Sequence, residues 1–400
     1  MAAEGRQSGS ARDLFSEIIG QERVIRILKS AIDAAHDRDS AQSQVMVQSW
    51  IFTGPPGSGR SNVAVAFAGG LLCNERGCGA CHSCHMVKKN SHPDLEVIRT
   101  EGLSLKIDEV REIIARASWE PSTSRYRVVV VEDAERLTES AANALLKAIE
   151  EPGVRTIWLL CAPTIEDVLP TIRSRCRQIS LVTPTTEAVA QLLVREEKVE
   201  QKIADLAARA SQGHIGRARF LAQEPESRAR RDEVITFALN LSDVAGAMSG
   251  AARVMEIAAL EAESEASDRD EAEREELANA LGVGATRKSP AGSSKILKDL
   301  EKEQKSRVTR ATRDSIDRAL LDISTAYRDV LAIQMGRLSG AHSTELINEH
   351  LREAIEKRAL SCTSEDVMRR WEALMATRQS LKFNVAPLLA LEALFLKVRF

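Results

Sequence analysis

A glycine-rich turn between an apolar strand and a helix constrains the fold of this chain more than any other feature. The turn reads Gly54-Pro55-Pro56-Gly57-Ser58-Gly59-Arg60-Ser61. The apolar segment 48–53 before it predicts a buried strand, and residues 61–72 after it predict a helix. Glycines let successive backbone N–H groups turn toward phosphate oxygens, and the positive end of the next helix strengthens the attraction. The pattern therefore predicts a phosphate loop at the edge of a parallel sheet.

Strands and helices alternate beyond this loop. Segments 127–131 and 156–161 are apolar enough for buried strands, and residues 140–151 between them predict a helix that Pro152 ends. Such alternation indicates a parallel sheet with helices on both faces. A first helix is expected over 13–35, where apolar residues recur at near-helical spacing.

The 400 residues exceed the usual size of a single domain. We expect an α/β phosphate-loop domain with a parallel sheet over residues 13–182. A small helical unit should follow over 183–223. Residues 224–400 predict an almost wholly helical part, because they are rich in Ala, Leu and charged residues. Residues 1–12 are small and polar and are expected to be disordered.

The nucleotide site departs from the pattern that hydrolysis needs. The usual lysine of the loop is Arg60, whose planar guanidinium cannot mimic a compact ammonium between the β- and γ-phosphates. Ser61 would still supply the hydroxyl for Mg²⁺. After the strand 127–131 the acidic pair is Glu132-Asp133, the reverse of the usual Asp-Glu, so each carboxylate is displaced by a methylene group. Surface acids that cap a strand are the alternative interpretation of this pair. The candidate nucleotide-binding residues of this degenerate site are Gly54, Gly57, Gly59, Arg60, Ser61, Glu132 and Asp133.

Four of the seven cysteines crowd into twelve residues. Their spacing is C-x4-C-x2-C-x2-C, at Cys73, Cys78, Cys81 and Cys84. Without a secretion signal, such spacing favours metal binding over disulfides. Four thiolates can surround one tetrahedral Zn²⁺, and a metal with no open coordination position is structural. An iron–sulfur cluster is the alternative, and His82 and His85 are near enough in sequence to replace a thiolate.

Charge and hydropathy narrow the surroundings in which the chain works. A formal net charge of -3 gives it no general attraction to nucleic acid. No apolar run is long enough to span a bilayer, and residues 1–12 lack the apolar core of a signal peptide. We therefore expect a soluble, cytoplasmic protein without membrane contact.

A charged insertion interrupts the helical part over about residues 261–313. Residues 261–276 carry nine acids against two arginines, and residues 287–313 carry nine bases against three acids. A solvated helical hairpin or a flexible insertion is the expected structure. A basic arm that touches DNA or an acidic partner is the alternative.

Several strings resemble one family, the bacterial clamp-loader subunits with an ATPase fold, which include the delta-prime subunit of DNA polymerase III. With the phosphate loop and the cysteine module, they cover about residues 13–223. The strings are Ile19-Gly20-Gln21-Glu22, His92-Pro93-Asp94, Asn143-Ala144-Leu145-Leu146-Lys147-Ala148-Ile149-Glu150-Glu151-Pro152 and Ile172-Arg173-Ser174-Arg175-Cys176. The resemblance implies an AAA+ domain with an inserted zinc module at 73–84, a helical lid domain over 183–223 and a helical collar domain from 224.

The resemblance also implies a role for Arg175. In the family, the Ser-Arg-Cys motif presents its arginine to nucleotide held by the neighbouring subunit. Arg175 would then be a catalytic arginine finger supplied in trans, which neutralises the charge that grows on the transferred phosphoryl group. Pairing of Arg175 with a local acid is the alternative.

Two kinds of subunit share this architecture, the ATP-hydrolysing tau/gamma motor and the delta-prime stator. Cys161-Ala162-Pro163 lacks the polar residue with which motors sense γ-phosphate. Gly216 stands near the position where motors place an arginine, although Arg217 is adjacent. Together with Arg60 and the reversed acidic pair, these departures favour the stator. The ATPase activity of the chain itself is then expected to be weak or absent, and whether ATP binds with Mg²⁺ stays open.

A stator of this kind implies tau/gamma and delta subunits as partners, in an arc of five subunits. Through the assembled complex it would meet the sliding clamp and primed DNA, as a component of the DNA polymerase III holoenzyme, a DNA-directed DNA polymerase. Two other functions stay open. One is a competent ATPase such as the motor itself, and the other is a zinc-dependent nucleic-acid-binding protein on an inactive nucleotide fold.

Overall fold

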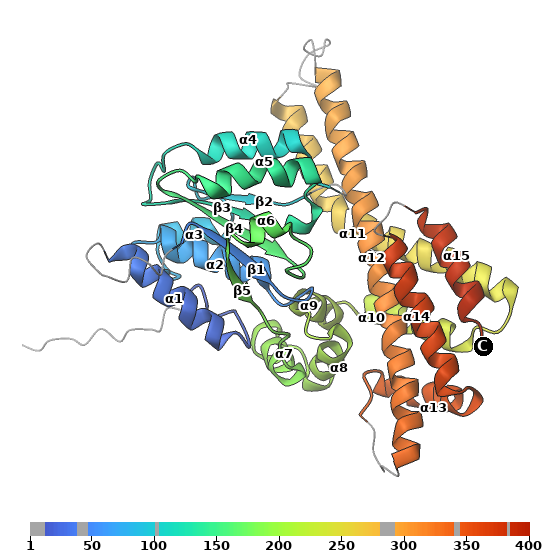
Figure 1. Ribbon diagram of the computed structural model, residues 1–400. Coiled ribbons are helices and arrows are strands. Elements are labelled where there is room, and N and C mark those ends of the chain that lie inside the picture. The colour runs from blue at the N-terminus through green and yellow to red at the C-terminus, as the bar shows by residue number, and fades with distance from the viewer. Residues whose placement is uncertain (1–12, 38–46, 101–103, 281–292, 340–344, 382–384) are drawn as a thin grey trace, which may run out of the picture. The chain divides into compact units, whose positions relative to one another are not determined.

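The computed structural model describes residues 13–37, 47–100, 104–280, 293–339, 345–381 and 385–400 (Figure 1). The chain divides into two compact units, Met1–Arg219 and Phe220–Phe400. The disorder expected for residues 1–12 lies outside the described residues.

A parallel five-stranded sheet forms the centre of the first unit, as the alternating pattern predicted. Its strand order is β2-β3-β4-β1-β5. Of the three inner strands, β1 and β4 are buried at every position and β3 at every position but its first, which explains their apolar sequences. The strands are β1 Ser49–Thr53, β2 Leu95–Ile98, β3 Arg127–Val131, β4 Thr156–Ala162 and β5 Arg177–Ser180.

Helices cover both faces of this sheet (Figure 1). On one face lie α1 (Glu22–His36) and α2 (Arg60–Leu72), where Trp50 packs edge-on against Phe67 with ring centroids 4.9 Å apart. On the other face lie α4 (Ile107–Ala117), α5 (Glu139–Glu150) and the short α6 (Pro170–Arg173).

The remaining short elements of the first unit are mostly helical. The segment 183–223, expected to be helical, contains a bundle of small helices with buried alanines. These elements are α3 (His82–Lys88), η2 (Ala134–Arg136), α7 (Thr186–Leu192), η3 (Leu193–Glu197) and α8 (Gln201–Ser211). The boundary between the two units falls inside the next helix, α9 (Ile215–Gln223).

The prediction of a first helix from residue 13 is wrong at its start. The helix begins at Glu22, and residues 13–20 form turns. The carboxylate of Asp13 accepts a hydrogen bond from the backbone N–H of Phe15 at 3.1 Å, which favours a turn. Gly20 has a φ of 69°, in the left-handed region where a right-handed helix cannot continue.

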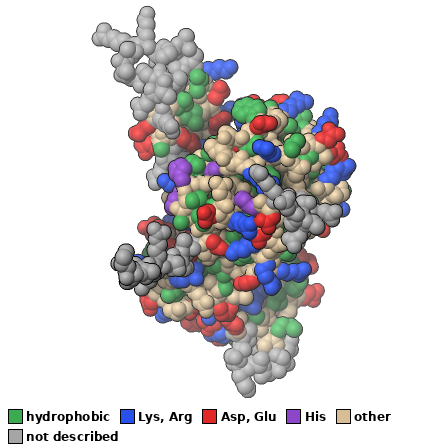
Figure 2. Space-filling model, turned by 90° about the vertical axis from the view of Figure 1, so that its left-hand side faces the viewer, with side chains coloured by type: hydrophobic (Ala, Val, Ile, Leu, Met, Phe, Trp, Pro, Cys, Tyr) green, Lys and Arg blue, Asp and Glu red, His purple; other side chains and the backbone are tan. Residues whose placement is uncertain are grey.

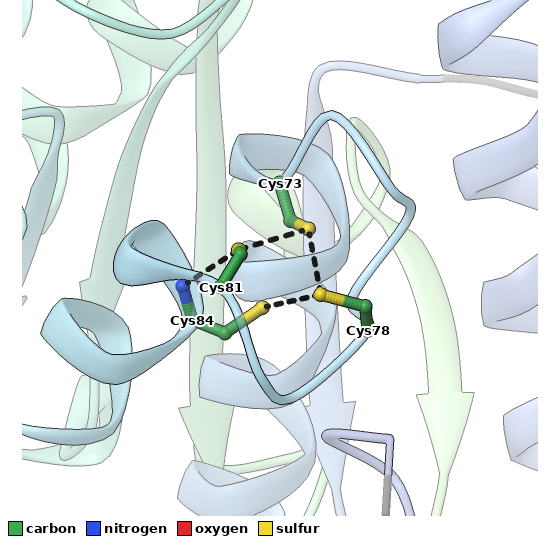
Figure 3. A group of neighbouring side chains, drawn as sticks. All are labelled: Cys73, Cys78, Cys81 and Cys84. Carbon is green, nitrogen blue, oxygen red and sulfur yellow. Dashed lines mark hydrogen bonds between the residues drawn. The ribbon is translucent and has the colours of Figure 1, made fainter. Parts of the chain in front are cut away.

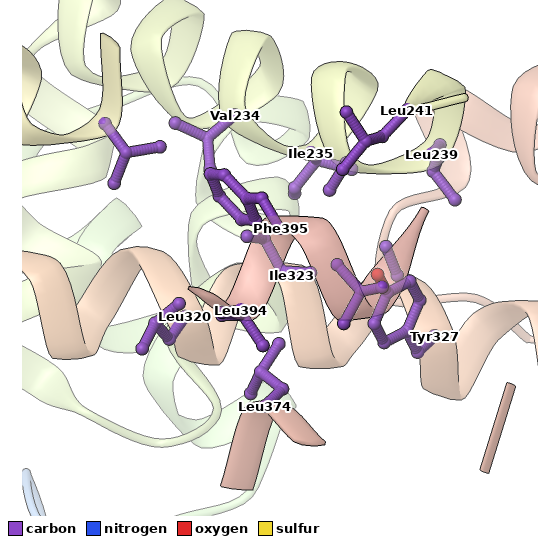
Figure 4. Packing of buried hydrophobic residues seen from close by; sticks show 14 of the residues in the cluster. Val234, Ile235, Leu239, Leu241, Leu320, Ile323, Tyr327, Leu374, Leu394 and Phe395 are labelled. Carbon is purple, nitrogen blue, oxygen red and sulfur yellow. The ribbon is translucent and has the colours of Figure 1, made fainter. Parts of the chain in front are cut away.

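The second unit contains helices and, among its described residues, no strand, as predicted. Its core joins α10, α12, α14 and α15 through side chains such as Ile235, Tyr327, Leu374 and Phe395 (Figure 4). The elements are α10 (Pro225–Asn240), α11 (Val244–Ala280), α12 (Ser293–Ser339), η4 (Glu349–Leu351), α13 (Arg352–Ser361), α14 (Ser364–Leu381) and α15 (Pro387–Val398).

The described part of the charged insertion lies in the paired helices α11 and α12, which run side by side (Figure 1). Acids of α11 face bases of α12: Arg307 Nη1 lies 3.1 Å from Glu273 Oε2 and 2.5 Å from Asp270 Oδ1. Gln304 Nε2 donates to the backbone oxygen of Asp270 at 2.9 Å. Opposite charges therefore hold a helical hairpin together; residues 281–292 lie outside the described residues.

None of the described helices combines the length and the apolar character that crossing a bilayer requires.

Candidate functional site

The predicted phosphate loop lies between β1 and α2, with Gly57 and Gly59 in the left-handed region at φ values of 83° and 85°. These conformations explain why glycines occupy the two positions. A Cβ atom at Gly57 would lie 2.2 Å from Cγ of His214, which belongs to the turn between α8 and α9. The loop is thus closely covered by a residue that the sequence did not single out.

Arg60 turns its guanidinium back onto the loop. Its Nη1 donates a hydrogen bond to the backbone oxygen of Gly54 at 2.6 Å. Ser61 follows as the second residue of α2 and is half-buried. The cation that a phosphate loop normally offers to nucleotide is therefore engaged by the loop's own backbone.

The reversed acidic pair lies where the sequence placed it, directly after β3. Glu132 Oε2 accepts a hydrogen bond from Arg99 Nε at 2.9 Å, and the side chain of Glu132 is only 14% exposed. Asp133 precedes the short η2 turn.

A third carboxylate, Glu135, lies close to this pair and was missed by the sequence analysis. Burial raises the pKa of Glu135. The negative charge of Asp133 raises this pKa further, and the positive charge of Arg60 lowers it. Its buried Oε2 has no hydrogen-bond partner among the described residues. Its position two residues after the acidic pair was the one available signal.

Arg175 lies just after α6, with its side chain 42% exposed. Its Nη2 forms an ion pair with Glu150 Oε1 at 2.6 Å. Its Nη1 donates to the backbone oxygen of Thr171 at 2.9 Å and to Ser174 Oγ at 3.1 Å. The chain on its own thus contains the local ion pair that was the alternative interpretation, and the role of Arg175 in trans stays a prediction.

The four cysteines converge, as their spacing predicted (Figure 3). Cys73 Sγ lies 3.9 Å from Cys78 Sγ and 3.6 Å from Cys81 Sγ, and Cys78 Sγ lies 4.0 Å from Cys84 Sγ. Zn–S bonds of about 2.3 Å imply sulfur atoms roughly 3.8 Å apart at the corners of a tetrahedron. The four thiols therefore fit one zinc ion, whereas a cluster of several irons would hold its thiolates further apart.

The surroundings of the cysteines suit thiolate ligands. The backbone N–H groups of Gly79 and Cys84 donate to Cys84 Sγ at 3.3 Å and to Cys81 Sγ at 3.4 Å. The N–H of Ala80 lowers the pKa of Cys78 to about 7, although burial opposes it. Burial raises the pKa of the Cys81 and Cys84 thiols. The group contains cysteines alone, so neither His82 nor His85 is needed as a ligand.

A buried carboxylate fixes the loop that leads into β3. Asp94 is 0% exposed, and its carboxylate accepts five hydrogen bonds. The donors are the backbone N–H groups of Ser122, Thr123 and Ser124 and the hydroxyls of Ser122 and Thr123. Burial alone would raise the pKa of Asp94, but these donors lower it to about 2. Ser124 Oγ also donates to the backbone oxygen of Leu72 at 3.2 Å, beside Cys73. The carboxylate thereby supports the cysteine module from outside.

Surface charge is mixed. Figure 2 shows lysine and arginine side chains interspersed with acidic ones over the face that it presents.

The chain is similar in sequence to known subunits of DNA polymerase III. The family described as "DNA polymerase III, delta subunit" matches residues 31–185. The DNA polymerase III subunit delta' of Haemophilus influenzae is 39% identical over 150 residues, which are 36% of this chain and 46% of the relative. The subunit gamma/tau of Mycobacterium tuberculosis H37Rv is 33% identical over 196 residues, which are 48% of this chain and 32% of the relative.

Among solved structures, a gamma-subunit-related protein of DNA polymerase III from Thermotoga maritima superposes with a TM-score of 0.43 at 15% identity. That superposition covers 94% of this chain and 98% of the other. The chain spans less than half the length of the two curated relatives above. The chain is thus similar to the family described as "DNA polymerase III, delta subunit" over residues 31–185, and proteins named delta-prime subunits are among its relatives.

Proposed function

We propose that this chain is a delta-prime-type stator subunit of a DNA polymerase III clamp loader. In this role it does not turn over ATP itself, and Arg175 reaches nucleotide that a neighbouring subunit holds. One contrast carries the proposal. The guanidinium of Arg60 in the chain's own phosphate loop donates to Gly54 at 2.6 Å, whereas that of Arg175 lies 42% exposed at the surface.

The chemistry of the chain's own site supports a weak or absent ATPase. Hydrolysis needs a cation on the β- and γ-phosphates and carboxylates placed for Mg²⁺ and water. Here the cation is engaged by the loop backbone and Glu132 is engaged by Arg99. His214 lies against Gly57, where the loop would have to admit phosphate.

The proposed architecture has three parts. An AAA+ domain over residues 13–182 would bear the degenerate nucleotide site, a helical lid would span 183–223, and residues 224–400 would form the share of this chain in an oligomeric collar. The partners would be tau/gamma and delta subunits, and the assembled complex would load the sliding clamp onto primed DNA. The family match at residues 31–185 and the delta-prime relatives support this assignment.

The metal in this proposal is structural. Cys73, Cys78, Cys81 and Cys84 would hold one Zn²⁺, and their Sγ atoms all lie within 4.8 Å of one another. When bound, the ion would cross-link the end of α2 to α3.

Replacing Arg175 in a reconstituted loader tests the function. The loader is assembled from this chain with its species' gamma/tau and delta subunits, and ATP hydrolysis is measured with clamp and primed DNA. Arg175→Ala should remove a contribution of roughly 10³-fold or more at the one site that the arginine serves. The turnover of the whole loader should then fall by at least that site's share.

Arg173→Ala is the matched control, because Arg173 is exposed on the same short segment and forms no ion pair with any residue that the structure describes. It should leave turnover unchanged. Unaltered turnover with Arg175→Ala in an intact loader would refute the finger. Failure of the chain to assemble with gamma/tau and delta would refute the clamp-loader role itself.

A further inference from the structure

The last residue of α5 is a carboxylate in a position that helix electrostatics disfavour. α5 ends at Glu150, with Glu151 as its C-cap and Pro152 after it. The C-terminal end of a helix carries partial negative charge, so an acid there costs roughly 0.3–1 kcal/mol. The Glu-Glu-Pro string was noted in the sequence, yet the proposed function assigns it nothing.

Glu150 has a specific partner, the guanidinium of Arg175. Oε1 of Glu150 lies 2.6 Å from Nη2 of Arg175, and the two side chains are 38% and 42% exposed. An exposed ion pair of this kind stabilises a fold by only about 0.2–1 kcal/mol. The pair therefore adds little to folding, and its value lies in where it holds the arginine.

The guanidinium is fixed from two elements. The backbone oxygen of Thr171, which is part of α6, and Oγ of Ser174, which follows α6, accept hydrogen bonds from Nη1. Oε1 of Glu150, at the end of α5, contacts Nη2. A guanidinium has five N–H donors in one rigid plane. Three are used by these contacts, so two remain for an external anion, which is the number that a bidentate phosphate contact requires.

We infer that Glu150 is a positioning residue for Arg175: it orients the guanidinium before the neighbour's phosphate arrives. This inference rests on the proposed function, in which Arg175 acts in trans. Holding a long side chain in one orientation in advance removes the cost of ordering it at the moment of reaction. Because the ion pair is exposed and weak, the developing charge on a phosphoryl group can share or replace it at little cost.

A latch that keeps Arg175 away from its target is the opposite role, and it predicts the opposite sign. Removing a latch accelerates the neighbour's hydrolysis, whereas removing a positioning residue slows it. The weakness of an exposed pair argues against a latch, since one carboxylate in water competes poorly with a triphosphate for an arginine.

The test is a double-mutant cycle in the reconstituted loader. Glu150→Ala should slow DNA-stimulated ATP hydrolysis at the one site that Arg175 serves by about 2- to 5-fold, the equivalent of an exposed ion pair, and it should lower the kcat of the whole loader by less than Arg175→Ala does. The KM for ATP should stay within about 2-fold, because ATP binds in the neighbour. Glu150→Ala combined with Arg175→Ala should be no slower than Arg175→Ala alone.

Glu151→Ala is the matched control: Glu151 is the adjacent exposed carboxylate and forms no ion pair within the described part of the chain. It should leave kcat unchanged. Glu150→Gln keeps a neutral hydrogen-bond acceptor and should fall between Glu150→Ala and the unmodified chain. Thermal melting of each variant checks that the fold is retained.

The outcomes separate the inference from the function on which it rests. If Arg175→Ala slows the loader but Glu150→Ala does not, the positioning role is wrong and the stator proposal stands. A faster loader with Glu150→Ala, or a double variant slower than Arg175→Ala, also overturns the positioning role. If Arg175→Ala has no effect, the finger is wrong and the inference falls with it.

Discussion

Asp94 and Arg60 are both charged side chains that hydrogen-bond to the backbone of their own chain, with opposite consequences. Asp94 is held by five donors and fixes the loop before β3. Arg60 donates to the backbone oxygen of Gly54, a contact that we propose keeps it from nucleotide. At the scale of residues, such contacts decide which charges support the structure and which are available for chemistry.

The buried carboxylate leads to a stability prediction. In Asp94→Asn an amide N–H₂ group replaces one carboxylate oxygen. Its N–H groups then face the backbone N–H and hydroxyl donors that the oxygen accepted from, so the free energy of unfolding should fall by about 2–4 kcal/mol. Denaturant unfolding at pH 7 measures the loss. Asp108→Asn is the control: its side chain is 87% exposed, and it should change stability by no more than about 0.5 kcal/mol.

The same carboxylate gives the prediction a pH dependence. The pKa of Asp94 is lowered from 3.8 to about 2, so its ionised form stabilises the fold above pH 3.8, and this contribution is lost as the pH falls through 2. The stability difference between Asp94→Asn and the unmodified chain should shrink by about 1 kcal/mol between pH 5 and pH 3. A constant difference over that range would contradict the account.

Single residues with a motif around them could be located from the sequence. Arg60, Arg175 and the four cysteines stand in recognisable strings. His214 could not be located in this way, because it contacts the phosphate loop from a position far away in the sequence. Glu150 belongs to the recognisable string 143–152, but its partner Arg175 lies on another element. Such a pair depends on tertiary packing, which the sequence pattern does not show.

At the scale of elements, periodicity predicted the long buried segments and missed the short ones. The strands predicted at 48–53, 127–131 and 156–161 each agree with β1, β3 and β4 to within one residue at either end. β2 and β5 have four residues each and lie at the edges of the sheet. Edge strands mix polar with apolar residues, so no unbroken apolar run announces them.

The cysteine module yields the prediction for an element. Metal analysis of the purified chain should find about one zinc per chain, because four thiolates lie at tetrahedral spacing. Cys78→Ser with Cys81→Ser should abolish the zinc and lower the melting temperature of the first unit, because α3 loses its link to α2. Cys362→Ser, in the second unit, is the control and should retain the zinc. Iron in place of zinc would contradict the assignment.

For the whole molecule, the sequence indicated a sheet domain followed by helices, and the described residues bear this out. The two compact units divide after Arg219, and the expected domain bounds at 182 and 223 stay predictions. The separate lid and collar remain proposals, because these domains are defined by their contacts with other subunits. The hydrophobic periodicity of one chain does not predict such contacts.

The central claim is that this chain lends an arginine to a neighbour but does not split ATP itself. Steady-state ATP hydrolysis by the purified chain, with and without primed DNA, tests it most directly. We predict turnover no higher than that of an Arg60→Ala variant, and no stimulation by DNA. Turnover well above that variant and accelerated by primed DNA would contradict the claim.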